Sequence, residues 1–232
     1  MIDLKNNHEK IKSIKKACEL ADETFYFIKN KLRAGQTEKQ VAKIINGFIQ
    51  KNGGKLVFRT IVSFGKNTAN VHHKPTDKVL RIGQLIMLDL GAKVDGYCSD
   101  LTRMLFLKST SPEFKKLYAL VLKAQESAIE KIKKEKSAQK IDEAAREVIN
   151  KNGYGKYFLH GLGHSLGLKI HENPHLNPKS KDILRIGDIV TIEPGIYIKG
   201  KGGVRIEDDV LVGRNNIEIL TKSSKELKDI II

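Results

Sequence analysis

Residues 80–102 read LRIGQLIMLDLGAKVDGYCSDLT, and this stretch decides the expected fold. The apolar run at residues 85–88 ends in Asp89, Gly91 opens a turn, and Asp100 falls within the next apolar strand. A carboxylate at the end of a buried strand is costly unless it is paired, protonated or bound to a metal. Two such carboxylates on neighbouring strands indicate either a shared ligand or two ion pairs with core arginines. This stretch alone leaves both alternatives open.

The same pattern occurs a second time in the chain. LRIG at residues 80–83 recurs at residues 184–187, which places Glu193 where the first copy has Asp89. Three further pairs keep a similar spacing of about 100 residues: His72 with His171, Asp100 with Glu207, and residues 37–53 with residues 137–153. A steady offset of this size predicts a duplication and excludes a short-period solenoid. We expect one domain over residues 1–232, built from halves at about residues 9–108 and 111–213, with a site between them.

The composition of the chain limits the partners and the cellular location that can be expected. The net charge of +15 comes mainly from lysines spread along the chain with few aromatic residues between them, which is typical of solvated helix faces and not of a nucleic-acid interface. Cys18 and Cys98 are too few for a disulfide framework, as in a reducing cytoplasm. No signal-peptide core or membrane-spanning apolar run is present. We expect a cytoplasmic protein that binds neither membranes nor nucleic acid.

Hydrophobic spacing predicts two helices in each half. Apolar residues at helical intervals predict helices at about residues 9–33 and 111–136, and each is followed by a shorter one at residues 38–51 and 138–151. Thr37 and Ser111 are expected N-caps, and Pro112 suits a first helical position. Strands are expected at residues 57–64, 85–89, 189–193 and 204–209. The fold class expected is α/β (α+β).

Five residues form the expected site: Asp89, Asp100, His164, Glu193 and Glu207. Like-charge repulsion would keep four carboxylates apart in an apolar core, whereas two divalent cations about 3.5–4 Å apart would balance them. One histidine among oxygen donors suits manganese, our first choice, or cobalt, iron or zinc. A hydroxide held between two such cations is a nucleophile at neutral pH, so the expected chemistry is metal-assisted hydrolysis.

Four segments carry a resemblance to a known family. LDLGAKVDGYCSDLTR, HGLGHSLGLKIHENP, VTIEPGIYI and GGVRIEDDV resemble the catalytic domain of the pita-bread metallopeptidases, which include Xaa-Pro aminopeptidases, Xaa-Pro dipeptidases, methionine aminopeptidases and creatinases. The resemblance covers nearly the whole chain. It implies a pita-bread fold, in which two pseudo-symmetric halves, each with two helices and an antiparallel sheet, surround a dinuclear metal centre held by the five residues above.

The same resemblance implies roles for further residues. Glu193 would be both a metal ligand and the proton shuttle, supported by Arg205 and Tyr197. His72 and His171 would bind substrate and stabilise the tetrahedral intermediate, while His160 would line the substrate pocket. Strand alternation separately places Arg205, Glu207 and Asp209 on one face. His73 and His8 are expected to be ordinary polar residues.

Two departures from the family pattern bear on substrate length. The motif VRIED at residues 204–208 is similar to the proline-specific branch, but no N-terminal accessory domain is expected. His175 also stands where many dipeptidases carry an arginine that would grip the substrate's terminal carboxylate, and a neutral histidine cannot offer that bidentate fork. We therefore expect an Xaa-Pro aminopeptidase that cleaves peptides of three or more residues with proline second, and count His175 among the substrate-binding residues.

Several alternatives remain at this stage. They are an Xaa-Pro dipeptidase, a methionine aminopeptidase, a creatinase-like hydrolase and a non-catalytic peptide-binding relative. Homodimer formation is left open. All five expected metal ligands are present, which favours catalysis over a non-catalytic peptide-binding role.

Overall fold

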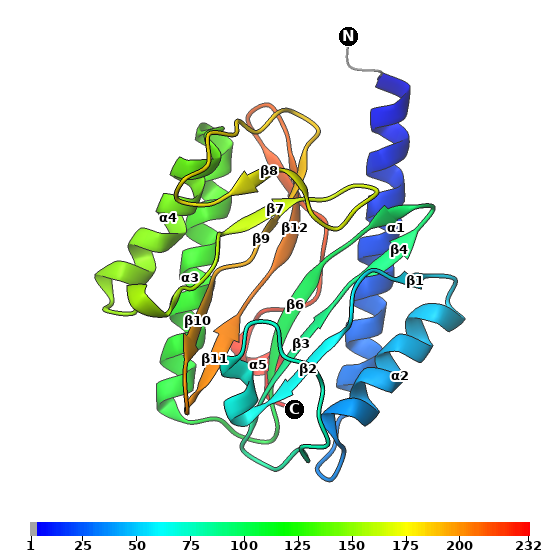
Figure 1. The fold of residues 1–232 in the computed structure, drawn as a ribbon, viewed down its shortest axis with the longest axis vertical. Coiled ribbons are helices and arrows are strands. Elements are labelled where there is room, and N and C mark those ends of the chain that lie inside the picture. Colours follow the sequence, from blue (N-terminus) through cyan, green and yellow to red (C-terminus); the bar gives the residue numbers. More distant parts are fainter. Residues whose placement is uncertain (1–3) are drawn as a thin grey trace.

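Two pairs of helices flank the strands, one pair from each half of the chain (Figure 1). The computed structural model describes residues 4–232, with side chains from residue 8 on, so the first three residues of the expected domain lie outside it. Helices α1 (Leu4–Lys29) and α2 (Glu38–Lys51) cover one side, and α3 (Pro112–Lys134) and α4 (Ala138–Lys151) cover the other. Within each pair the two helices contact each other.

The first half builds two small antiparallel sheets. Strands β2 (Ile61–Phe64), β3 (Leu85–Leu90) and β6 (Leu101–Phe106) form one sheet in the order β2-β3-β6. Strands β1 (Lys55–Leu56), β4 (Ala92–Val94) and β5 (Tyr97–Cys98) form the other. Every residue of β3 and β6 is buried, as the nearly continuous apolar sequence of β3 predicts, whereas β6 also buries the polar residues Thr102 and Arg103. A short 3₁₀ helix, η1 (Gly65–Ala69), follows β2.

The second half repeats this arrangement and extends it. A five-stranded sheet has the order β13-β12-β9-β7-β8, made of β7 (Gly163–Ser165), β8 (Glu172–Leu176), β9 (Ile189–Ile192), β12 (Asp208–Val212) and β13 (Ile217–Ile219). Strands β10 (Gly195–Ile198) and β11 (Gly202–Arg205) form a hairpin. The core order β7-β9-β12 matches β2-β3-β6 of the first half, as the sequence offset predicts. The 3₁₀ helix η2 (Gly155–Tyr157) precedes β7, and α5 (Leu227–Ile230) lies near the C-terminus.

The helix starts follow from local hydrogen bonds. Thr37 caps α2 in a capping box, in which its side chain accepts from the backbone of Gln40 and the Gln40 side chain accepts from the Thr37 backbone. Ser111 caps α3 and Pro112 occupies the first turn. These predicted starts are confirmed.

Two predicted strands are partly wrong. The strand expected at residues 204–209 is interrupted at residues 206–207, so that β11 pairs with β10 and β12 pairs with β9. Residues 57–60 belong to no strand, and β2 begins only at Ile61. The Thr60 hydroxyl donates a hydrogen bond of 2.6 Å to Asn46 on α2. Phe58 and Arg59 then line a cleft. Apolar and β-branched residues in this segment imitate a strand without forming one.

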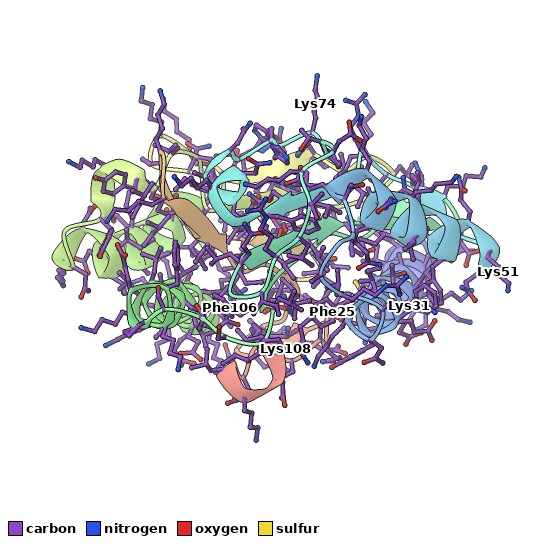
Figure 2. The ribbon with its side chains drawn as sticks, turned by 90° about the horizontal axis from the view of Figure 1, so that it is seen from below. Phe25, Lys31, Lys51, Lys74, Phe106 and Lys108 are labelled. Atoms are coloured by element: carbon purple, nitrogen blue, oxygen red, sulfur yellow. The ribbon has the colours of Figure 1, made fainter. Side chains whose placement is uncertain are left out.

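One large apolar core joins the halves, and a separate small cluster contains Ile14, Cys18, Leu166, Ile189 and Leu220. Buried residues from all four long helices and from both large sheets belong to one contiguous cluster. Phe25 and Phe106 lie inside it, whereas Lys31, Lys51, Lys74 and Lys108 are at the surface (Figure 2). Within residues 4–232 no helix combines the length and apolar character needed to span a membrane.

A buried ion pair ties β6 to β12. Arg103 on β6 is 1% exposed, and its guanidinium donates to Asp208 Oδ1 at 2.6 Å and to the Ser223 carbonyl at 3.0 Å. Lys225 is a second partner of Asp208. Although burial opposes it, Arg103 and Lys225 hold the pKa of Asp208 below its usual range. The pair therefore fixes the chain beside Glu207, the residue before Asp208.

Replacing Arg103 should destabilise the fold strongly. Arg103→Met leaves Asp208 buried with only the partly exposed Lys225 as a charge partner, and breaking a buried pair on one side costs about 3–5 kcal/mol. Urea unfolding should show that loss. Lys133→Met, which breaks the exposed pair with Glu130, is the matched control and should change stability by less than about 0.5 kcal/mol. A loss below about 1 kcal/mol for Arg103→Met would contradict this account.

Candidate active site

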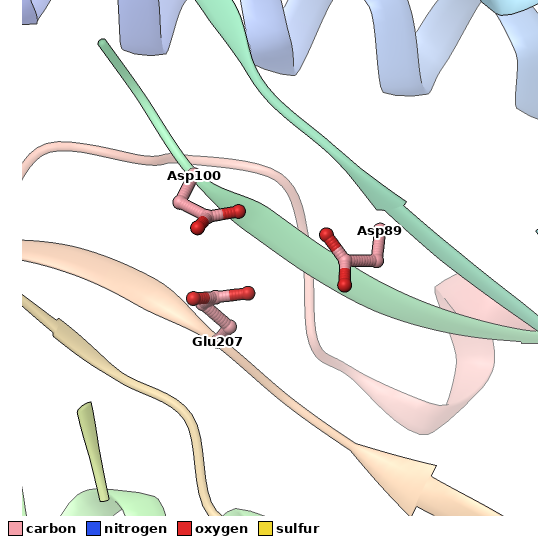
Figure 3. A group of neighbouring side chains, drawn as sticks. All are labelled: Asp89, Asp100 and Glu207. Atoms are coloured by element: carbon pink, nitrogen blue, oxygen red, sulfur yellow. The ribbon is translucent and has the colours of Figure 1, made fainter. Parts of the chain in front are cut away.

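Three carboxylates meet where the two halves join (Figure 3). Asp89 lies near the end of β3, Asp100 directly precedes β6, and Glu207 lies between β11 and β12. One carboxylate oxygen from each residue lies within 4.8 Å of the others. All three side chains are buried. Asp100 is therefore one residue before the strand in which the sequence pattern placed it, yet it reaches the expected position.

His164 and Glu193 extend this cluster. His164 Nε2 lies 3.5 Å from Glu193 Oε1 and 3.9 Å from Asp100 Oδ2. Its Nδ1 is 3.2 Å from the Ser165 carbonyl oxygen, which can only accept, so Nδ1 carries the proton. Burial, reinforced by nearby His171, lowers the pKa of His164 to about 4. At pH 7 the ring is therefore neutral and presents a lone pair to two carboxylates.

The cluster has more negative charge than the protein neutralises. Burial, reinforced by the charge of Glu207, raises the pKa of Asp100 and of Glu193 well above the usual carboxyl range. Burial and neighbouring Asp89 raise the pKa of Glu207 to about 8. Asp89 Oδ1 is buried and has no hydrogen-bond partner among residues 4–232. Oxygen donors with one imidazole nitrogen suit divalent cations, so these residues fit a metal centre.

Arg205 and Thr102 hold the carboxylates of Asp89 and Glu207 in place. Arg205 forms an ion pair with Asp89 Oδ2, and its Nε donates to Thr102 Oγ1 at 3.0 Å. The Thr102 hydroxyl in turn donates to Glu207 Oε2 at 2.6 Å. The predicted alternation is confirmed, because Arg205, Glu207 and Asp209 all face this site whereas Asp208 faces Arg103. Thr102 was not predicted as a site residue.

A hydrogen-bond chain with a fixed direction runs from Arg205 to His160. Arg205 donates to the Tyr197 hydroxyl at 2.8 Å, which donates to His160 Nε2 at 2.8 Å. His160 Nδ1 donates to the Gly161 carbonyl at 2.7 Å. Burial and the Arg205 charge lower the pKa of His160 to about 3, and burial raises the pKa of Tyr197 to about 12. Within the described chain neither Arg205 nor Tyr197 hydrogen-bonds Glu193, so their direct partners are Asp89 and His160.

The acids lie in a cleft of about 660 Å³ whose wall carries the other expected histidines. His72 and His171 are exposed there, and the His171 ring centre is 4.4 Å from that of His164. His175 on β8 pairs directly opposite His164 in the β-ladder. His160 also lines the cleft. Tyr197 is buried, with 2% of its surface exposed, so it acts on the cleft only through His160 and Arg205.

His73 has a structural role that its sequence context did not indicate. It is buried, and its Nε2 lies 2.8 Å from Glu38 Oε2. Glu38 also accepts from the backbone of Phe64 and from the backbone and hydroxyl of Thr76. These contacts fix both ends of the loop that carries His72. Exposed His8 contributes to neither the cleft nor this network.

The chain is similar to known metallopeptidases. Residues 12–214 match the model of metallopeptidase family M24. An Xaa-Pro dipeptidase of Pyrococcus furiosus is 41% identical over 220 residues, which are 94% of this chain and 63% of that protein. An Xaa-Pro dipeptidase structure from Bacillus anthracis has a TM-score of 0.93 at 41% identity, covering 97% of this chain and 63% of the other.

A further solved structure has a different named activity. An X-Pro aminopeptidase from Thermotoga maritima has a TM-score of 0.91 at 38% identity, and the match covers 94% of this chain and 62% of that one. These similarities confirm the expected pita-bread fold. The chain spans about 63% of the length of the curated relatives it matches.

Loading with manganese should give close to two ions per chain, because four converging carboxylates need that much positive charge. Elemental analysis after removal of excess metal measures the ratio. Glu207→Gln should lower it, whereas Glu218→Gln, on the exposed strand β13, should leave it unchanged. A manganese content near zero in the parent chain would contradict the metal-centre assignment.

Proposed function

Because the chain belongs to metallopeptidase family M24, we propose that it removes the N-terminal residue from short peptides with proline in the second position. One observation carries the proposal. A neutral histidine lone pair and four carboxylates converge at the base of a cleft, and a single arginine is their only paired cation among the described residues. That arrangement is suited to holding divalent cations beside a bound peptide.

The proposed chemistry divides among named residues. Bound divalent cations would neutralise the carboxylates and lower the pKa of water enough to supply hydroxide near neutral pH. Glu193 borders the cleft and would take a proton from the attacking water and deliver it to the leaving proline nitrogen. His171 and His72 would donate hydrogen bonds to the carbonyl oxygen as negative charge develops on it. Arg205 holds Asp89 in place.

The relatives' names favour dipeptides as substrates. Two Pyrococcus relatives are named Xaa-Pro dipeptidases, which supports that activity over the aminopeptidase expected from the sequence. The sequence argument considered only the position of His175 as a partner for the substrate's terminal carboxylate. Arg59 and Lys74 both line the cleft, and an arginine there can pair with the substrate's terminal carboxylate. An Xaa-Pro dipeptidase is therefore our first candidate.

A second candidate is an Xaa-Pro aminopeptidase acting on longer peptides. His175, beside His164 on the cleft wall, lacks the guanidinium fork that would hold a dipeptide's carboxylate at that point. Manganese as the native metal and a homodimeric state remain parts of the proposal.

Glu193→Gln should reduce turnover far more than it weakens substrate binding. Loss of general acid–base help typically costs about 10²–10⁴ in rate, and this residue would also bind metal. Steady-state kinetics on Met-Pro should show a fall in kcat with a small change in KM. The His171→Ala variant should lose a factor of about 10²–10³ in kcat, as expected when a hydrogen-bond donor to the oxyanion is removed. Its metal content should be unchanged. Near-normal turnover of Glu193→Gln would place the proton shuttle elsewhere.

Substrate length separates the two candidate activities. The kcat/KM for Met-Pro should exceed that for Met-Pro-Ala if the terminal carboxylate is bound in the cleft, and both should exceed Met-Ala-Ala. The His175→Arg variant should have about tenfold higher kcat/KM for Met-Pro, because a charge-assisted hydrogen bond to the substrate's carboxylate is worth about 1.5–3 kcal/mol. Faster cleavage of Met-Pro-Ala by the parent chain would assign it to the aminopeptidases. A preference for Met-Ala-Ala would overturn proline specificity altogether.

A further inference from the structure

A second hollow of about 500 Å³ adjoins the active-site cleft along one face of α2. It is lined by Lys39, Ala42, Lys43, Asn46, Gly47, Gln50, Arg59, Thr60, Lys74 and Pro75, which together define the α2 groove. The helical residues recur every three or four positions, so they share one face of α2. Arg59 and Lys74 line both hollows. Arg59 and Lys74 therefore form a wall that the groove and the cleft share.

The α2 groove carries positive charge and no acid. Four of its lining residues are cationic and exposed: Lys39, Lys43, Arg59 and Lys74. Lys39 pairs with Asp77 at 2.7 Å, whereas the other three form no ion pair within residues 4–232. Figure 2 shows Lys74 standing out from the surface. Three uncompensated cations in one hollow favour an anionic ligand.

Gly47 keeps the floor of the groove open. It lies in the middle of α2, where glycine costs about 1 kcal/mol relative to alanine. A Cβ at this position would meet no atom within 4 Å. Packing therefore does not require glycine here, and the missing side chain leaves bare backbone between the lysines and Arg59.

We propose that the α2 groove binds the acidic carboxyl-terminal part of peptides longer than two residues. This inference rests on the proposed function in its second form, the aminopeptidase, which acts on peptides longer than two residues and keeps one residue on the amino side of the scissile bond. The remainder of such a peptide must leave the cleft, and the groove lies next to the cleft at the shared residues Arg59 and Lys74. Acidic side chains complement its charge. The lining has no aromatic side chain on which nucleic-acid bases could stack, so a peptide is the better match.

The direct test uses two uncleavable peptides whose Met–Pro amide is reduced to an amine, one ending in Glu-Glu and the other in Gln-Gln. Calorimetric titration of the metal-loaded chain should show about five- to tenfold tighter binding of the Glu-Glu peptide at low salt, as expected for a few exposed ion pairs. The preference for the Glu-Glu peptide should decrease at about 0.5 M salt, because salt screens interactions between exposed charges.

Variants locate the preference in the groove. Lys43→Ala and Arg59→Ala should each reduce it about two- to threefold. Lys51→Ala is the matched control, because Lys51 is exposed on the same helix but outside the groove (Figure 2), and it should retain the full preference. The Gly47→Gln variant should bind both four-residue peptides more weakly but a reduced Met-Pro analogue equally well. The melting temperature of this variant should be unchanged or higher.

Hydrolysis of Met-Pro on the same preparation separates the two proposals. Active protein with equal affinity for both peptides overturns the groove assignment alone. Inactive metal-loaded protein overturns the proposed function whatever the affinities. Binding of a short single-stranded oligonucleotide that Lys43→Ala and Arg59→Ala abolish, without any Glu-Glu preference, would assign the groove to nucleic acid and overturn the peptide proposal.

Discussion

A buried carboxylate costs several kcal/mol of free energy unless a positive charge or hydrogen-bond donors meet it, and this fold brings four carboxylates to one place. Arg205 satisfies one oxygen of Asp89, and Thr102 satisfies one oxygen of Glu207. Asp100 Oδ1 accepts from the Leu101 N–H at 3.1 Å, and Glu193 Oε1 accepts from the Thr191 hydroxyl at 3.4 Å. One oxygen from each of Asp89, Asp100 and Glu207 nevertheless lies within 4.8 Å of the others, and His164 Nε2 lies near Asp100 and Glu193. Divalent cations would resolve that conflict. The cleft above the acids then offers space and donors for a peptide.

The site depends on the joint between the two halves. Asp89 and Asp100 come from the first half, and His164, Glu193 and Glu207 come from the second. Two backbone N–H groups donate across the joint: the Asp100 N–H donates to Asp209 Oδ2 at 2.9 Å, and the Glu207 N–H donates to the Thr102 carbonyl at 3.2 Å. The ligand geometry is therefore built into the core and does not rely on surface loops. The residues that the proposed function assigns to the substrate, His72 and Arg59, are in contrast exposed on the wall of the cleft.

Local patterns in the sequence predicted the helix caps, the duplicated sheet order and the common face of Arg205, Glu207 and Asp209, because each depends on residues close in the chain or on a regular period. Long-range partners were not predictable in this way. Glu38 pairs with His73 across 35 residues, and Thr102 reaches Glu207 across 105. No local pattern in the sequence indicates contacts between residues this far apart in the chain. The α2 groove was not predictable from the sequence either, because scattered lysines and Arg59 share a surface only after folding.

Anomalous diffraction from manganese-soaked crystals tests the central claim most directly. Two anomalous peaks should lie among the oxygens of Asp89, Asp100, Glu193 and Glu207, about 3.5–4 Å apart as in dinuclear hydrolytic sites, and one of them should lie within bonding distance of His164 Nε2. The Arg205–Asp89 contact should persist beside them. The absence of any peak in this cluster at saturating manganese would contradict the account.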